Sequence, residues 1–117
     1  MEKYDLLIKL LEMLLNSNAP ENKGLNDLNE YDYKIGENYF IRTVTHILVG
    51  KLQYKTDQEL ILNNCSWIAD TGRYHDALKT GNLNEIEPYP SESLVHVNRG
   101  SFIDAVIWGH ELPKDQK

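Results

Sequence analysis

A chain of 117 residues and 13.6 kDa has the size of one domain, and 41% hydrophobic with 26% charged residues is typical of a globular protein. A net charge of −6, from 12 basic and 18 acidic residues, argues against binding of extended nucleic acid through its phosphates. Cys65 is the single cysteine, so an intrachain disulfide is impossible and a reducing, cytoplasmic setting is expected.

The first predicted element is an amphipathic helix over residues 1–16. Leucines recur there at spacings of three and four, which gives one apolar stripe on a helix that includes Leu7, Leu10, Leu11 and Leu14. The stripe either covers an open face of its own domain or binds a partner, and we expect a homo-oligomer. Charged residues interrupt the apolar run, so we predict neither an export signal nor a membrane span.

Residues 17–35 are predicted to form a linker, because this stretch is rich in asparagine and contains a proline and a glycine. The domain itself is expected at 36–110, with an insertion at 65–93. Residues 111–117 should form a surface tail.

Five strands are predicted within the domain, from their content of β-branched and aromatic residues. They lie at about 38–46, 47–55, 58–64, 93–98 and 101–108. Gly50 suits a sharp bend or a close approach of two backbones. Arg99 and Gly100 suggest a tight connection between the last two strands, with Gly100 free to take a positive φ.

The insertion carries the most unusual stretch of the sequence, "WIADTGRYHDALKTG" at 67–81. We predict a short helix that Asp70 or Thr71 caps and Gly81 ends. Its apolar face would consist of Tyr74, Ala77 and Leu78. The following "EIEPYP" should be extended, because a residue that precedes proline avoids the helical region.

Two segments, "VGKLQYKTDQELILNNC" and "VHVNRGSFIDAVI", resemble the two sequence motifs of Sm-like proteins. The resemblance implies a mainly β (α+β) fold, namely a small five-stranded bent-sheet SH3/Sm-like barrel. It would carry an N-terminal helix and a helical insertion between strands 3 and 4. An SH3-like barrel of other ancestry would have almost the same order of elements.

The resemblance also implies a site. In Sm-like rings the arginine-glycine turn and the loop before the glycine bend line a nucleotide-binding surface, which here corresponds to Asn98, Arg99 and Gly100. Thr45 and His46 correspond more weakly. The second half of the chain is further similar to small uncharacterised proteins of bacteriophages and prophages, which implies a phage origin.

The insertion adds Trp67, Arg73, Tyr74 and His75 as candidate ligand-binding residues. An arginine in the first turn of a helix opposes the helix dipole, so Arg73 should have a specific acceptor. That acceptor is a nearby aspartate or backbone carbonyl, a ligand phosphate or a partner's carboxylate. The aromatic residues are either a stacking wall for a base or part of the core.

No catalytic constellation is recognisable, and the histidines lack the spacing of a metal site. We therefore expect no enzymatic activity, no metal and no cofactor. The favoured hypothesis is a phage-encoded binding protein that antagonises a host defence, in one version by sequestering a nucleotide-type signalling molecule. The alternatives are an acidic inhibitor that docks on a host defence protein or nuclease, and a phage structural or assembly factor.

Overall fold

The computed structural model of the chain describes residues 5–9, 11 and 32–117. The chain divides into two compact units, Met1–Tyr33 and Lys34–Lys117. In the first unit, residues 5–9 and 11 are helical, as the leucine spacing predicts. Leu7 and Leu11 are 63% and 60% exposed. Leu10 and Leu14 lie outside the described residues, as does most of the predicted linker.

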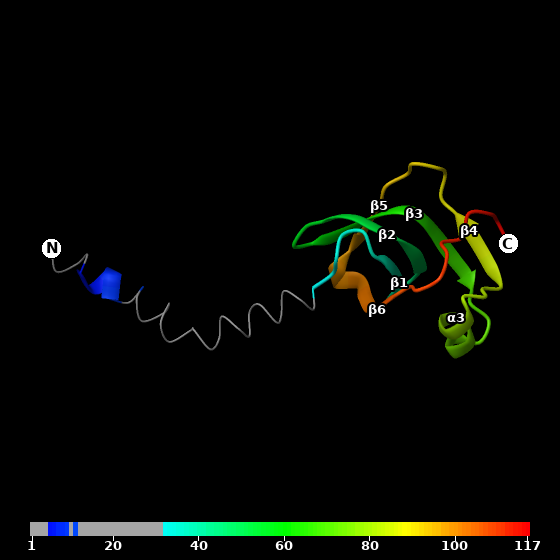
Figure 1. Ribbon diagram of the computed structural model, residues 1–117, viewed down its shortest axis with the longest axis horizontal. Helices are drawn as coiled ribbons and strands as arrows, with labels where there is room; N and C mark the ends of the chain where they lie inside the picture. The colour runs from blue at the N-terminus through cyan, green and yellow to red at the C-terminus, as the bar shows by residue number, and fades with distance from the viewer. Residues whose placement is uncertain (1–4, 10, 12–31) are drawn as a thin grey trace. The chain divides into compact units, whose positions relative to one another are not determined.

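The second unit contains one antiparallel sheet (Figure 1). Its strands are β1 (Asn38–Thr43), β2 (Ile47–Lys55), β3 (Glu59–Asp70), β4 (Glu85–Pro88), β5 (Val95–Asn98) and β6 (Phe102–Ile107). The strand order is β4-β3-β2-β1-β6, and β5 also pairs with β3. The prediction of a mainly β fold is therefore confirmed.

The sheet has six strands where the sequence predicted five, and no pairing among these strands closes it into a barrel. Two parts of the predicted insertion account for the difference. First, β3 continues to Asp70 instead of ending near residue 64. Second, β4 pairs with this extension, with Ile86 opposite Ile68. The prediction missed both because the run "CSWIAD" mixes polar and apolar residues without regular alternation.

Two strands, β5 and β4, pair with the same edge of β3, one after the other along its length. β5 pairs with the first part of β3, where Val97 lies opposite Leu60. β4 pairs with the last part, and the backbone N–H of Tyr89 donates to Cys65 O at 2.9 Å just beyond it. Residues 85–98 thus run antiparallel to β3 as one strand that a loop at 89–94 interrupts.

Between β2 and β3 the register shifts at Gly50. Val49 lies opposite Ser66 and Lys51 opposite Asn63, so β3 has one extra residue, and Asn64 takes a φ of 49°. A Cβ added to Gly50 would lie 3.1 Å from the Cα of Cys65. The predicted close approach of two backbones is therefore confirmed.

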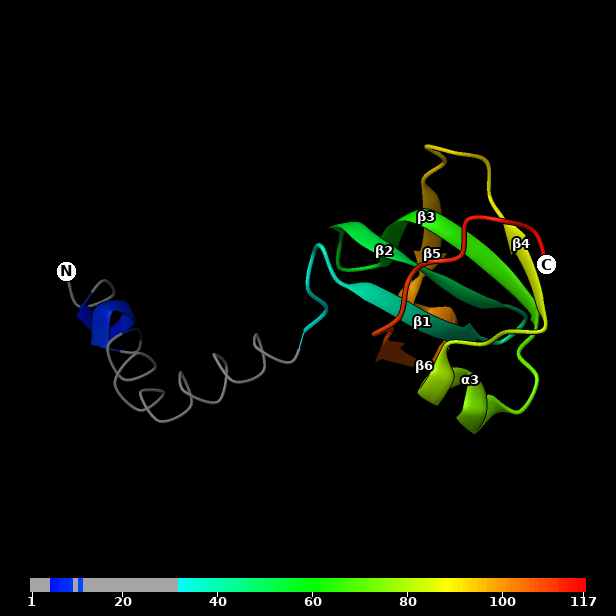
Figure 2. The same cartoon turned by 45° about the vertical axis from the view of Figure 1, so that its right-hand side comes forward.

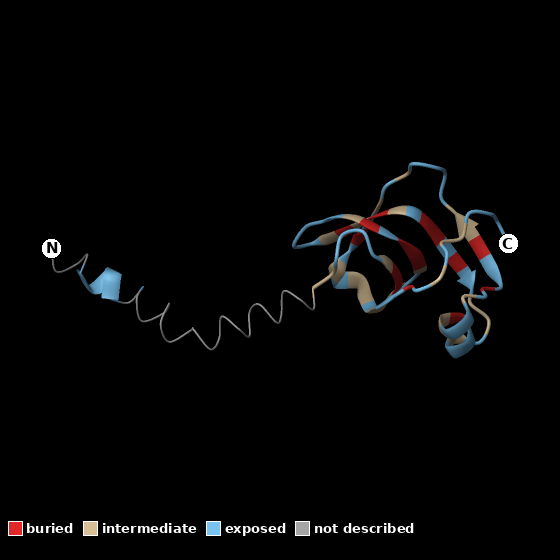
Figure 3. Cartoon of the chain, viewed as in Figure 1, coloured by how far each residue is buried: buried red, intermediate tan, exposed pale blue. Residues whose placement is uncertain are grey.

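Buried residues lie along the strands of the sheet, as the red segments in Figure 3 show, and each face of the sheet buries apolar side chains. Because side chains alternate along a strand, paired positions share a face. One face carries Ile41, Leu48, Leu52, Leu60, Leu62 and Val97. The other face carries the buried cluster Phe40, Val49, Ile68, Ala77, Leu83, Ile86 and Trp108, to which the helix α3 (Tyr74–Thr80) contributes.

The predicted helix in the insertion is present as α3, but its N-cap differs. Arg73 is the N-cap residue and makes no side-chain capping bond. Asp70 accepts from the backbone N–H of Gly72 at 2.8 Å, which closes a turn before the helix, so the predicted capping by Asp70 or Thr71 is wrong. The end at Gly81, with a φ of 80°, is confirmed, as is the burial of Ala77.

The connection between β5 and β6 is a 3₁₀ turn at Arg99–Ser101. The Asn98 side chain accepts from the backbone N–H of Gly100 at 2.7 Å and holds the turn. The glycines with positive φ among the described residues are Gly36, Gly72 and Gly81, so the positive φ suggested for Gly100 is wrong. The turn does not need a positive φ at Gly100, because the hydrogen bond to the Asn98 side chain stabilises it.

The C-terminal segment, residues 108–117, crosses the sheet from the end of β6 to β4 (Figure 2). The backbone N–H of Trp108 donates to Asn38 O at 2.8 Å, and Leu112 packs against the buried cluster. At the far end, Lys117 and Ile86 exchange two backbone hydrogen bonds of 2.9 and 3.0 Å. The tail predicted at the surface is largely exposed, but it is fixed to the sheet at both ends.

Candidate functional site

Of the turn residues predicted from the Sm-like resemblance, Asn98 lines a cavity of about 240 Å³, here called the turn cavity. Asn98 and His46 both line it, together with Thr43 and Ser101. Trp67 lies next to it, with its ring centroid 5.9 Å from that of His46. The structure therefore brings Asn98, His46 and Trp67 into one neighbourhood, although they come from different strands and loops.

The other candidates of the insertion lie on α3. Arg73 and His75 are exposed at its start, whereas the Tyr74 ring packs on Phe40 with centroids 6.0 Å apart. No ion pair joins Arg73 to Asp70 or Asp76 among the described residues. None of these residues, nor Arg99 or Gly100, lines the turn cavity.

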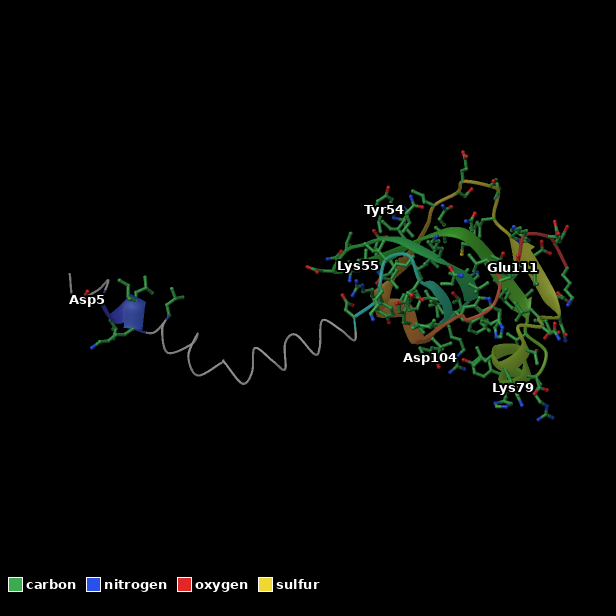
Figure 4. All side chains as sticks on the ribbon, viewed as in Figure 1. Asp5, Tyr54, Lys55, Lys79, Asp104 and Glu111 are labelled. Carbon is green, nitrogen blue, oxygen red and sulfur yellow. The ribbon has the colours of Figure 1, made fainter. Side chains whose placement is uncertain are left out.

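An ion pair that the sequence analysis missed lies beside Tyr74. Arg42 and Asp104 are cross-strand partners on β1 and β6 (Asp104 is labelled in Figure 4), and Arg42 Nε donates to Asp104 Oδ1 at 2.8 Å. A second bond joins Arg42 Nη2 to Asp104 Oδ2. The guanidinium also lies over the Tyr74 ring, 4.7 Å from its centroid. Because its donors already bind Asp104, Arg42 is a structural residue here.

This ion pair predicts a pH effect. The hydrogen bond from Arg42 holds the pKa of Asp104 below its ordinary value. The pair therefore contributes stability above the ordinary carboxyl pKa and loses it as the pH falls through the lowered pKa. The contribution should be small, because the Asp104 side chain is 39% exposed and the pair is screened by solvent.

An NMR titration of the Asp104 carboxyl should give a midpoint below that of an ordinary aspartate, and Arg42→Gln should raise it. A midpoint that does not move in the Arg42→Gln variant would contradict the role of the ion pair.

A second cavity, of about 600 Å³, lies under the C-terminal segment. We call it the C-terminal cavity. Its floor consists of β1, β2 and β3, which contribute Asn38, Lys51 and, at the bulge, Asn64 and Cys65. Small-molecule sites typically have volumes of roughly 300–1,000 Å³, so the cavity could hold a ligand the size of a nucleotide.

Two segments wall this cavity. The start of the 89–94 loop contributes Tyr89 and Ser91, and the C-terminal segment contributes Glu111 and Lys114. Glu111, labelled in Figure 4, lies over the sheet where the C-terminal segment crosses it. The walls therefore depend on two segments that the sequence analysis treated as an extended connection and a surface tail.

The lining has the chemistry of a polar binding site. Lys51 and Lys114 against Glu111 give the lining a net charge of +1 (2 − 1), whereas the chain as a whole carries −6. The amides of Asn38 and Asn64 offer donors and acceptors. Tyr89 is 40% exposed, so part of this aromatic residue is accessible to a ligand.

Cys65 borders the cavity but does not supply a nucleophile. Its side chain is 2% exposed, and burial raises the pKa of the thiol to about 12. The thiol is therefore protonated at neutral pH, whereas the reactive form is the thiolate. Cys65 acts as a packing residue opposite Gly50.

The chain matches no known family model, and no curated protein resembles it closely enough to count as a match. Among residues 5–9, 11 and 32–117, no three or more histidine, cysteine, aspartate or glutamate side chains come together as a metal site would require. Within the same residues, no helix has the length and apolar character needed to span a membrane.

Proposed function

We propose that the protein binds a small anionic ligand of the nucleotide type, without catalysis, in the C-terminal cavity. The observation that carries this proposal is the cavity of about 600 Å³ with two lysines and an exposed tyrosine. Lys51 comes from β2 and Lys114 from the C-terminal segment, and both ammonium groups are suited to phosphate oxygens. Tyr89 offers a stacking surface for a base, and stacking is worth about 1–3 kcal/mol per base.

The resemblance to phage proteins extends the proposal to a biological role. A protein that binds a nucleotide-type signal in the cytoplasm of a bacterial host would remove that signal and so antagonise the defence that depends on it. We also infer that the sheet is an open relative of the Sm-like barrel. The β1-β2-β3 meander, Gly50 at the bulge and the 3₁₀ turn after Asn98 support this relationship.

The alternative function is docking on a host protein as an acidic inhibitor. The exposed Leu7 and Leu11 on the helical part of the first unit favour it, because apolar side chains on one helix stripe suit a partner's groove. The net charge of −6 would then speed association with a basic partner and make binding sensitive to salt.

Native mass spectrometry of the freshly purified full chain tests the ligand proposal. We expect an added mass of nucleotide size, which denaturation releases for identification. A protein purified empty should bind a member of a panel of nucleoside mono-, di- and triphosphates and cyclic nucleotides in calorimetric titrations. An empty protein that binds no member of the panel at millimolar concentration would refute the proposal and favour docking on a host protein.

A further inference from the structure

The outer edge of β6 is an unpaired strand edge. β6 stands at the end of the sheet order, and no other described strand pairs with its outer side. Its residues are exposed or half-buried, in contrast to the buried stretches of β1, β2 and β3 (Figure 3). In Figure 1, too, the orange β6 lies at a margin of the sheet.

The hydrogen bonds to β1 show which backbone groups point outward. The N–H of Trp108 donates to Asn38 O, so the pair 108 and 38 is a hydrogen-bonded pair of the antiparallel ladder. Such pairs alternate with non-bonded pairs. Val106, opposite Phe40, is therefore bonded to β1, whereas Ala105 and Ile107 direct their N–H and C=O groups away from the sheet.

The side chains at this edge are apolar and lack the usual protection of exposed strands. Val106 and Ile107 are 36% and 61% exposed. Natural edge strands generally avoid pairing through lysine, proline or inward charges. The one charged residue of β6 is Asp104, and Arg42 already neutralises it. The edge at residues 105–107 is therefore open to another strand.

The sequence of this edge is complementary to itself. In an antiparallel pairing of two copies about a two-fold axis at Val106, Ala105 of each copy lies opposite Ile107 of the other. Their outward N–H and C=O groups then bond to one another. Val106 contacts Val106, and the large Ile107 side chain lies over the small Ala105.

This register also separates the charges. Asp104 of one copy lies opposite position 108 of the other, so the two Asp104 carboxylates do not face each other. Like charges directly opposite would destabilise the pairing.

We infer that two copies of the chain pair through β6, antiparallel about Val106, to form a two-fold symmetric dimer with one continuous sheet. A second copy is the occupant, because in this register β6 meets its own sequence with large residues opposite small ones and with the two Asp104 carboxylates apart. A symmetric dimer is also the commonest closed assembly of identical chains. In this dimer the contact between the two copies is made by β6, and the leucine stripe of the N-terminal helix is not needed for it.

A charge exchange at Val106 tests this register in the full chain. Val106→Lys places two lysines opposite each other across the two-fold axis, and Val106→Glu places two glutamates there. In analytical ultracentrifugation the wild type should sediment as a dimer. Each variant alone should raise the dimer dissociation constant at least about tenfold, and an equimolar mixture of the two should restore the dimer. Leu94→Lys, at a 44% exposed position in the 89–94 loop, is the matched control and should remain a dimer.

Hydrogen exchange gives a second readout that does not depend on substitutions. The amides of Ala105 and Ile107 should exchange slowly in the concentrated dimer and rapidly after dilution to the monomer. The Val106 amide, which bonds to β1, should stay protected in both and serves as the internal reference.

Three results would overturn the inference. They are a wild type that is monomeric at high concentration, a mixture of variants that fails to restore the dimer, and a dimer that Leu7→Lys with Leu11→Lys dissolves while Val106→Lys does not. Because Val106 does not line the C-terminal cavity, ligand binding can succeed or fail independently of these results.

Discussion

Replacing Trp108 with alanine is expected to lower the free energy of unfolding by about 3–5 kcal/mol, the range for deleting a large buried aromatic side chain. Trp108 is 3% exposed, and its ring stacks on Phe40 with centroids 5.3 Å apart. The His110 ring packs against the Trp108 ring in a T-shaped arrangement, with the two ring centroids 4.8 Å apart. Its removal leaves a cavity between the sheet and the C-terminal segment, because these neighbours are fixed by the surrounding strands. Urea unfolding followed by far-ultraviolet circular dichroism measures the change.

The second tryptophan of the chain is the matched control. Trp67 is 40% exposed, so Trp67→Ala should cost much less, about 1 kcal/mol, near the centre of the range for single substitutions. Trp108→Phe retains a ring on Phe40 and should fall between the two if Trp108→Ala is too unstable to purify. Equal losses for Trp108→Ala and Trp67→Ala would contradict the assignment of Trp108 to the core.

Trp108 also links the core to the C-terminal cavity. Its indole N–H donates to Glu111 O at 3.3 Å, and Glu111 belongs to the cavity wall. The residues that follow reach β4, where Lys117 pairs with Ile86. A loosened Trp108 would therefore move one wall of the cavity, and ligand affinity should fall together with stability.

The sequence was sufficient for those elements whose signals are local. A segment rich in β-branched and aromatic residues predicted β1 and β2. Gly81 after the "DALKT" run predicted the end of α3, because glycine readily adopts the left-handed conformation that ends a helix. Gly50 predicted a close approach of backbones, and the structure shows Cys65 there. In each case one residue type carries its own geometric preference.

Long-range pairing was beyond the sequence. β4 has four residues, and only its partner, the end of β3, makes it a strand. The candidate site also depends on long-range packing, since Lys51 and Lys114 line one cavity only because the C-terminal segment crosses the sheet. Two local signals could have pointed to the cavity: the Asn63-Asn64 pair inside a strand, which suits a bulge, and Tyr89, an aromatic residue between two prolines.

Replacing both Lys51 and Lys114 with alanine should reduce affinity for the nucleotide-type ligand by about a hundredfold or more. Each lysine can make a charge-assisted hydrogen bond worth about 1.5–3 kcal/mol, and 1.4 kcal/mol corresponds to a tenfold change in affinity. Both side chains are exposed, so stability should change by less than about 0.5 kcal/mol. Isothermal titration measures the affinity, which should also weaken with added salt.

The matched control removes the same charge from another part of the surface. Lys55 and Lys79, labelled in Figure 4, do not line the C-terminal cavity, and their double alanine variant should bind as the wild type does.

A Tyr89→Ala variant tests stacking. A loss of affinity that is confined to ligands containing a base would separate stacking from the charge effect. If Asn98→Ala with Trp67→Ala abolishes binding while Lys51→Ala with Lys114→Ala preserves it, the ligand occupies the turn cavity, and the assignment to the C-terminal cavity is wrong. Tyr89 lines both cavities, whereas Lys51 and Lys114 line only the C-terminal cavity and Asn98 lines only the turn cavity. The lysine and Asn98 variants therefore distinguish the two cavities without knowledge of the ligand's identity, and Tyr89→Ala does not.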